Sequence, residues 1–202
     1  MKTEIDAKTV KKLRDETGAG MMTCKKALAE NDGDYEKAIE SLKLKGLATA
    51  DKKASRSTNE GLIYSYIHTG SRLGIILEVK CETDFVARHE DFAGLAKNIA
   101  MQIASNPDIE VVSPNDISES AKEEVRQFES GKEDLQNKPE EIRNKIVEGR
   151  IEKSLKKQVL LDQEYIRDPS ITVDEYIKQV VGILGENIRV ARFTRYVLGE
   201  TD

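Results

Sequence analysis

The hydrophobic period of the chain changes abruptly near residue 83, and this change constrains the fold more than any other feature. Every second side chain of residues 73–82 is apolar, which predicts a β-strand with one face toward the core. That face consists of Ile75, Leu77, Val79 and Cys81. From about residue 89 to residue 105 the apolar spacing becomes helical. The apolar side of this predicted helix consists of Phe92, Leu95, Ala96, Ile99 and Ile103.

The junction between the two periods lies at Thr83, Asp84 and Phe85. Threonine and aspartate are typical of helix starts, because their side-chain oxygens accept hydrogen bonds from free amides of the first turn. The aromatic ring of Phe85 has two possible placements, either folded back into the core or projecting outward. Most aromatic side chains are buried, so the residue type alone favours the inward placement.

Residues 5–46 are predicted to form three short helices joined by turns. Asp6, Thr23 and Asp34 are the expected N-caps, and Gly46 is expected to end the third helix. Three helices in about 40 residues enclose only a thin core. We therefore interpret residues 1–46 as a docking module.

Residues 47–59 lose periodicity and are rich in Ala, Lys, Ser and Thr, so we interpret them as a linker that is partly helical. Lys52, Lys53 and Arg56 either meet an acidic partner or are simply solvated, and the second alternative is favoured. Residues 62–68 and 73–82 then predict a hairpin across a turn at residues 69–72.

The charge-laced region at residues 113–168 is predicted to be helical. Ser118 is expected to cap one helix, residues 131–138 to break it, and Pro139 to lie in the first turn of the next. Residues 172–175 fit a capping box for a further helix that Gly185 ends, and residues 188–198 alternate as a last strand. Residues 109–112 are either a short strand or an extended connection. The predicted class is α+β, with residues 60–202 forming a core and dimerisation domain around a small antiparallel sheet packed by helices.

Composition excludes several classes of protein. The formal net charge of -5 argues against direct nucleic-acid binding, and no segment approaches the roughly 20 apolar residues of a membrane span. The start of the chain shows no signal peptide. Cys24 and Cys81 have no CxxC partner, and His68 and His89 are isolated, so we expect reduced thiols, no metal site and no cofactor. These features predict a cytoplasmic protein.

No motif for catalysis is present. The sequence has no phosphate loop of the GxxxxGK[ST] type and no nucleophile elbow with a supporting histidine. The glycines of Gly18-Ala19-Gly20 follow a predicted helix instead of a strand, so they are interpreted as a turn between helices. We therefore predict that the protein is not an enzyme and has no catalytic residues.

Five sequence segments, in order along nearly the whole chain, resemble motifs of bacterial elongation factor Ts. Residues 13–28 (LRDETGAGMMTCKKAL) and residues 81–88 (CETDFVAR) resemble the two signatures of that family. Residues 138–142 (KPEEI), 146–150 (IVEGR) and 184–188 (LGENI) are also typical of it. Together these motifs are far more specific than a single glycine pattern.

The resemblance implies a guanine-nucleotide exchange factor that binds the GDP-bound and nucleotide-free forms of elongation factor Tu, displaces Mg2+ and promotes GDP release so that GTP can bind. It also implies a three-helix module similar to a ubiquitin-associated (UBA) domain. The segment that dislodges Mg2+ from the GTPase would consist of Thr83, Asp84, Phe85 and Val86, with the Phe85 ring projecting outward. The residues that dock the N-terminal module would be Arg14, Met21 and Met22, assisted by Lys25 and Lys53.

Some alternatives stay open beside the resemblance. One of the two methionines is expected to be a core residue, and Arg14 either contacts the partner or is solvated. Thr23 replaces the usual aspartate of the first signature, and Val159 and Glu164 also depart from the family pattern. Longer members carry a second copy of the core subdomain, whereas this chain has one, so we predict a homodimer. The alternative function is a scaffold or ribosome-associated protein that binds a GTPase without altering nucleotide release.

Overall fold

The structure is a computed structural model that describes residues 5–135 and 139–200. Contacts between residues divide the chain into two compact units, which are described separately. The first unit contains the residues up to Ile63, together with Glu78–Ala96 and Glu175–Arg189. The second contains Tyr64–Leu77, Lys97–Asp174 and the residues from Val190 onward.

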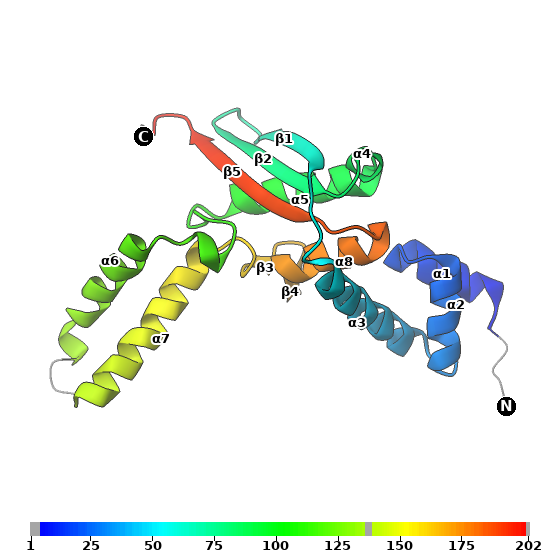
Figure 1. Cartoon of the computed structure of the whole chain (residues 1–202), viewed down its shortest axis with the longest axis horizontal. Helices are drawn as coiled ribbons and strands as arrows, with labels where there is room; N and C mark the ends of the chain where they lie inside the picture. The colour runs from blue at the N-terminus through cyan, green and yellow to red at the C-terminus, as the bar shows by residue number, and fades with distance from the viewer. Residues whose placement is uncertain (1–4, 136–138, 201–202) are drawn as a thin grey trace. The chain divides into compact units, whose positions relative to one another are not determined.

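The N-terminal region folds into the three predicted helices, drawn from blue to cyan in Figure 1. They are α1 (Ala7–Thr17), α2 (Met21–Glu30) and α3 (Tyr35–Lys53). Gly18 ends α1 in the left-handed conformation, at φ 68°, which glycine adopts without steric cost. The shared core of the three helices consists of Val10, Leu13, Cys24, Ala27, Leu28, Ala38 and Leu42.

Two predicted helix boundaries in this region are wrong, and one cap is confirmed. Asp34 caps α3, because its carboxylate accepts a hydrogen bond from the amide of Lys37. Helix α2 begins two residues before Thr23, with Gly20 at the N-cap position. Helix α3 continues past Gly46 to Lys53, so it occupies about half of the segment expected to be a linker.

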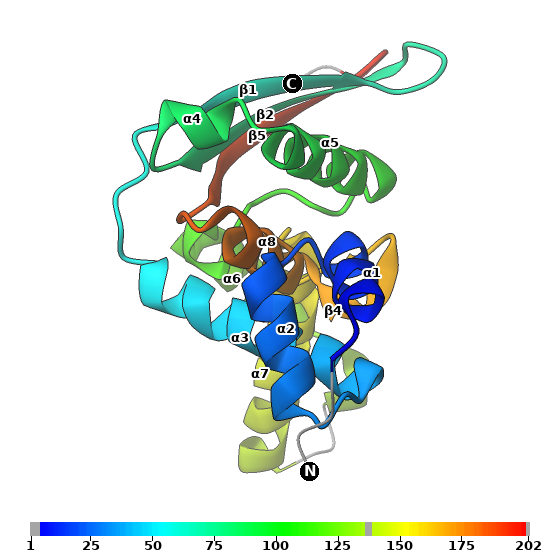
Figure 2. The ribbon, with the colours of Figure 1, turned by 90° about the vertical axis from the view of Figure 1, so that its right-hand side faces the viewer.

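A three-stranded sheet has the order β1-β2-β5, with β1 at Glu60–Ile67, β2 at Leu73–Cys81 and β5 at Arg189–Val197. Figure 2 shows the three strands running side by side. The hairpin between β1 and β2 is confirmed, and so is the final strand. The predicted inward face of β2 is also confirmed, since Ile75, Leu77, Val79 and Cys81 are fully buried.

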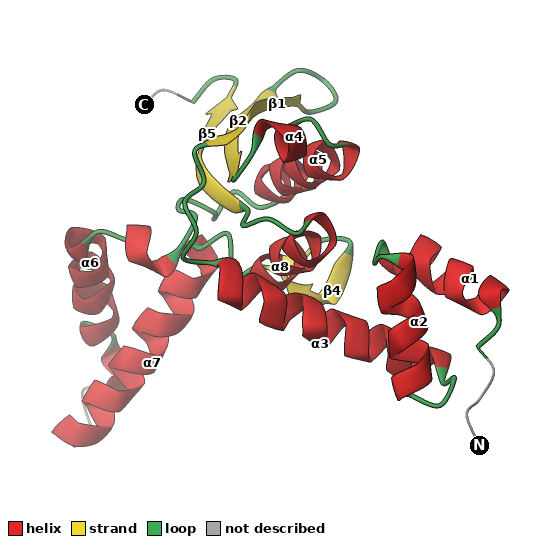
Figure 3. Ribbon diagram, turned by 45° about the vertical axis from the view of Figure 1, so that its right-hand side comes forward, coloured by secondary structure: helices red, strands yellow, loops and turns green. Residues whose placement is uncertain are grey.

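A second, two-stranded sheet was not predicted. Strand β3 (Glu164–Tyr165) pairs antiparallel with β4 (Asp168–Thr172), which Figure 3 draws in yellow. This pair begins within the region expected to be helical. Residues 109–112 form an extended connection whose Val111 makes an isolated parallel bridge to Val159.

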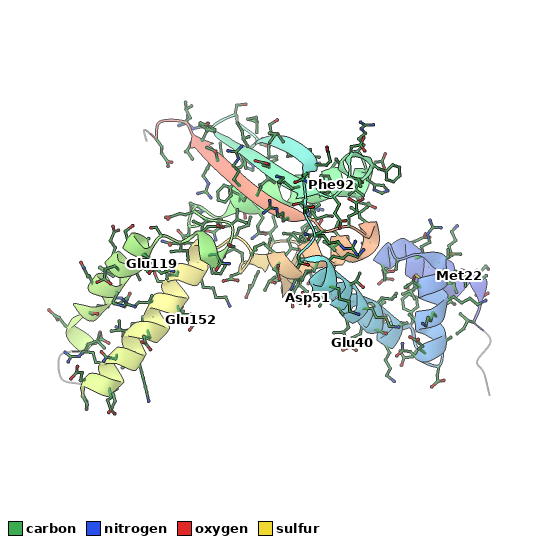
Figure 4. The ribbon with its side chains drawn as sticks, viewed as in Figure 1. Met22, Glu40, Asp51, Phe92, Glu119 and Glu152 are labelled. Carbon is green, nitrogen blue, oxygen red and sulfur yellow. The ribbon has the colours of Figure 1, made fainter. Side chains whose placement is uncertain are left out.

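Helices account for most of the remaining chain. Helix α5 (Glu90–Ser105) has the predicted buried side, including Phe92, which Figure 4 labels. Helix α6 (Glu119–Ser130) is capped by Ser118, as predicted, and packs with α7 (Glu140–Gln158) around Leu135, Val147 and Ile151. Pro139 is the residue before α7 instead of lying in its first turn. Short 3-10 turns occupy Pro114–Asp116 and Glu133–Leu135, and α8 spans Val173–Leu184. None of the helices within the described ranges is long and apolar enough to cross a membrane.

The close approach of α3 and α8 explains why Gly46 does not end its helix. A Cβ added to Gly182 of α8 would lie 2.9 Å from the Cα of Gly46, closer than real Cβ contacts allow. A Cβ added to Gly46 would meet nothing within 4 Å. The glycine in α8 therefore permits a backbone contact that helps to hold α3 helical.

Gly182→Ala should lower the free energy of unfolding by about 1–3 kcal/mol, because α3 and α8 must separate to admit the methyl group. Gly46→Ala is the matched control and should raise stability by up to ~1 kcal/mol, the helix-propensity gain of alanine over glycine. Urea unfolding followed by circular dichroism measures both changes. A Gly182→Ala protein as stable as the wild type would contradict the contact.

Candidate partner-binding site

The residues that follow β2 form a single helical turn, α4 (Asp84–Ala87), which Figure 1 labels. The side-chain oxygen of Thr83 accepts a hydrogen bond from the amide of Val86, at 3.4 Å, so Thr83 is the N-cap. The carbonyl of Thr83 accepts another from the amide of Ala87, at 3.2 Å. The predicted helix start at Thr83 is confirmed. We call residues 82–88 the Phe85 loop.

The ring of Phe85 projects into solvent, with 76% of its surface exposed. The inward placement that its residue type favoured is therefore wrong. Its neighbour Val86 is only 4% exposed and occupies the inward position of the turn. Successive helical residues point about 100° apart, so burial of Val86 turns the preceding ring outward.

Asp84 is also exposed beside the ring. Its carboxylate lies 3.0 Å from the guanidinium of Arg88, one turn later, and 64% of the Asp84 side chain is exposed. An exposed pair of this kind contributes about 0–1 kcal/mol. Asp84 can therefore exchange this partner for another at little cost in free energy.

The backbone at the start of the loop is held by a residue from the connection between α8 and β5. The carboxylate of Glu186 accepts hydrogen bonds from the amides of Glu82 and Thr83 and from the hydroxyl of Thr83. Sequence reasoning assigned no role to Glu186. The available signal was its place in the LGENI motif at residues 184–188.

The thiol of Cys81 lies beneath the same loop. Its Sγ donates a hydrogen bond to the carbonyl of Thr83, at 3.1 Å. Burial raises the pKa of the Cys81 thiol to about 11, and the negative charge of Glu186 acts in the same direction. A thiol with so high a pKa carries almost no thiolate near neutral pH, so Cys81 is a structural residue and not a nucleophile.

Four of the five predicted docking residues lie exposed on α1 and α2. Arg14 is in the last turn of α1, and Lys25 is on α2. Met21 is 43% exposed and Met22, labelled in Figure 4, is 78% exposed. The expectation that one methionine is a core residue is wrong, because Cys24, Ala27 and Leu28 fill the inward positions of α2.

Lys53, the fifth predicted docking residue, is placed differently from the other four. It ends α3, and its ammonium group donates a hydrogen bond to the carbonyl of Gly185, next to Glu186. The structure therefore brings Lys53 to the connection that supports the Phe85 loop. None of the described residues form a group of three or more His, Cys, Asp or Glu side chains suited to a metal ion.

Comparison with known proteins agrees with the motifs. A model of the family described as Elongation factor TS matches residues 4–200. The chain belongs to the elongation factor Ts family. "Elongation factor Ts, chloroplastic" of Phaeodactylum tricornutum is 82% identical over 202 residues, which is all of both chains. "Elongation factor Ts" of Synechococcus elongatus is 60% identical over 197 residues, which is 98% of this chain and 89% of the other. A chloroplastic elongation factor Ts from Rhodomonas salina is 58% identical over 200 residues, 99% of this chain and 91% of the other.

Membership in the elongation factor Ts family confirms the resemblance that the two signatures indicated, together with the α+β class. It assigns the chain to the translation elongation factors. The family match alone gives no role to individual residues. The roles of the Phe85 loop and of the exposed residues on α1 and α2 are therefore argued below from their geometry.

The Cys81 thiol should react at least about a hundredfold more slowly than an ordinary cysteine, because a pKa near 11 leaves little thiolate at pH 8. Ellman's reagent on a Cys24→Ala protein, in which Cys81 is the only thiol, measures the rate. The same protein unfolded in urea supplies the reference. A native rate within tenfold of the unfolded rate would refute the structural role of this thiol.

Proposed function

We propose that this member of the elongation factor Ts family is a guanine-nucleotide exchange factor for the translational GTPase elongation factor Tu. It binds the GDP form, displaces Mg2+ and promotes GDP release so that GTP can bind. The observation that supports this most directly is the exposed ring of Phe85 on a capped helical turn. Such a factor makes and breaks no covalent bond, so it needs no catalytic residue.

The physics of exchange explains what an exposed ring can do. A GTPase holds GDP through backbone amides around the phosphates and through a Mg2+ that bridges phosphate and protein oxygens. A partner weakens that grip only if it binds the distorted or nucleotide-free state better than the loaded state. In our proposal Phe85 packs into a pocket near the Mg2+ site. Removing the ring from water stabilises that complex by roughly 1.5–3 kcal/mol.

Asp84 has the complementary role in the same pocket. Its exposed carboxylate pairs with Arg88, and losing that surface pair costs about 1 kcal/mol or less. On docking it can accept hydrogen bonds from donors that the GTPase otherwise uses around its nucleotide. Thr83 and Val86 contribute by capping and anchoring the turn.

The ring does not supply enough free energy by itself. A thousandfold weakening of GDP binding requires about 4 kcal/mol of coupling. We therefore assign the remaining binding energy to docking by Arg14, Met21, Met22 and Lys25, whose exposed apolar and basic groups suit an interface. Lys53 is engaged within the chain, so we assign it a supporting role. Because coupling is reciprocal, returning nucleotide weakens the binding of the factor by the same ratio.

Phe85→Ala should slow GDP release while leaving stability almost unchanged, because the ring packs against little of its own chain. The expected loss of maximal rate is about tenfold or more, the equivalent of ~1.4 kcal/mol or more of pocket contact. Stopped-flow fluorescence of labelled GDP leaving elongation factor Tu measures the rate, and urea unfolding measures stability.

Phe92→Ala is the matched control for that measurement. Its ring is fully buried, so its removal should cost about 3–5 kcal/mol of stability. If the wild-type protein binds elongation factor Tu without accelerating GDP release, the protein is a scaffold and the proposed function is wrong. If Phe85→Ala unfolds the chain, the ring is a structural residue.

We also propose that the chain is a homodimer. In the second unit the three-stranded sheet exposes large side chains on each strand, namely Ile67, Ile76 and Tyr196, with Leu198 directly after β5. Large exposed apolar side chains on neighbouring strands are typical of an interface. A second copy of the chain would supply what the duplicated subdomain supplies in longer members. The division into a docking module (residues 1–46), a linker (47–59) and a core and dimerisation domain (60–202) also stays a prediction.

Light scattering at micromolar concentration should give twice the mass of one chain. Ile76→Lys should give the monomer mass, because it places an unpaired charge in the interface. The matched control is Ile142→Lys on α7, another exposed isoleucine, which should leave the dimer intact. A monomeric wild-type protein under these conditions would exclude the homodimer.

The compartment is part of the same proposal. The sequence features described above suggest a cytoplasmic protein. The cyanobacterial relatives suggest that it serves a translation system of the bacterial type. The 82% identity to a relative named as chloroplastic exceeds the 60% identity to the cyanobacterial one. This difference favours an elongation factor that serves translation within a plastid.

A further inference from the structure

We propose that Glu186 is the positioning residue of the Phe85 loop, so that its carboxylate fixes the backbone orientation in which the ring is presented. This inference rests on the proposed exchange function. It assigns a role to a residue that lies 103 positions from Thr83 in the sequence. Glu186 itself is only partly exposed, and it acts through the loop without being required to touch the GTPase.

One carboxylate satisfies three donors at the start of the loop. Its Oε2 accepts from the amides of Glu82, at 3.1 Å, and Thr83, at 3.0 Å. Its Oε1 accepts from the hydroxyl of Thr83, at 2.6 Å. Hydrogen bonds to an ionised acceptor are about twice as strong as neutral ones. The two successive peptide groups that carry the amides of Glu82 and Thr83, at the start of the Phe85 loop, are therefore fixed by one carboxylate.

The same contact determines how Thr83 caps the turn. The Thr83 hydroxyl donates its hydrogen bond to Glu186, so its lone pairs remain free to accept from the amide of Val86. Without Glu186, that hydroxyl can rotate and form other bonds. Loss of Glu186 therefore loosens both the peptide groups before the ring and the cap of the turn that carries it.

A second hydrogen bond, in the opposite direction, also joins the Phe85 loop to the segment that carries Glu186. The Glu82 carboxylate accepts from the amide of Asn187, at 2.6 Å, and lies 3.5 Å from the guanidinium of Arg56. The buried side chain of Asn187 donates to the carbonyls of Ala54, at 3.2 Å, and Arg56, at 2.8 Å. The segment that carries Glu186 is thus fastened to the chain just after α3, which makes it a firm support for the loop.

The test is stopped-flow release of fluorescent GDP from elongation factor Tu over a range of concentrations of the full-length factor. Glu186→Ala should lower the maximal rate by about tenfold, the effect of losing a charge-assisted contact. The half-saturating concentration should change by less than about threefold, because the docking residues on α1 and α2 are intact. Glu186→Gln keeps an acceptor oxygen and should recover part of the rate.

Glu40→Ala is the matched control. Glu40 is an exposed carboxylate on α3, labelled in Figure 4, and makes no contact with the Phe85 loop in the structure. It should leave both kinetic parameters unchanged. A Glu186→Ala protein with the same maximal rate as the Glu40→Ala protein would overturn the positioning role.

A double-mutant cycle with Phe85→Ala separates positioning from general support of the fold. If Glu186 acts through the ring, Glu186→Ala should reduce the rate of the Phe85→Ala protein by less than about twofold. Fully additive losses would overturn the inference.

Amide hydrogen exchange of the free protein provides a readout that needs no GTPase. The amides of Glu82 and Thr83 should exchange faster in both Glu186 variants than in the wild type. Unchanged protection of these amides in the Glu186→Gln protein would overturn the inference even if Glu186→Ala failed to fold. A wild-type protein that does not accelerate GDP release overturns the proposed function as well, whereas an active protein indifferent to Glu186 overturns only the positioning role.

Discussion

The burial of Val86 is the constraint on which the geometry of the Phe85 loop depends. Strand β2 buries alternate side chains as far as Cys81, and the chain then turns through a single helical turn in which Val86 is again buried. Between these two inward positions lie the half-buried Glu82, the cap Thr83 and the exposed side chains of Asp84 and Phe85. The ring of Phe85 faces solvent because the side chain of the next residue, Val86, occupies the inward position of the turn.

The first unit exposes two different surfaces, the Phe85 loop and the methionines of α2. The Phe85 loop is held within the chain, since the amides of Glu82, Thr83 and Val86 each have a side-chain acceptor there. The exposed methionines on α2 are flexible side chains that adapt to a partner of varied shape. In the proposed function these properties suit different tasks. An adaptable surface supplies affinity, and a fixed ring supplies the difference in affinity between two states of the GTPase.

Local patterns predicted much of this architecture. The alternation of β2, the helical spacing of α5 and the cap at Asp34 depend on neighbouring residues, and each is confirmed. The end of α3 was wrongly predicted at Gly46, because Gly46 contacts Gly182, which is distant in the sequence. Thr23 was misjudged because a good capping residue can equally lie inside the first turn. The short β3–β4 pair carries too few residues for a periodic signal.

The candidate site was only partly predictable for the same reason. The motif at residues 81–88 identified Phe85 and Asp84, but a four-residue turn has no periodicity that decides which side chain is outward. The support from Glu186 joins segments 103 residues apart, and no local pattern records such a contact. The exposure of both methionines follows from where α2 begins, which sequence patterns locate poorly.

The difference between the shielded sulfur of Cys81 and the open sulfurs of Met21 and Met22 has a consequence for oxidative stress. The thiol beneath the Phe85 loop is buried and protonated, so peroxide has little to attack there. The thioether of Met22 is exposed to solvent, and its sulfoxide would be polar where the proposed docking uses an apolar contact. If the proposed function holds, oxidants would therefore impair docking on the GTPase before they affect the Phe85 loop, and sulfoxide reduction would reverse the damage.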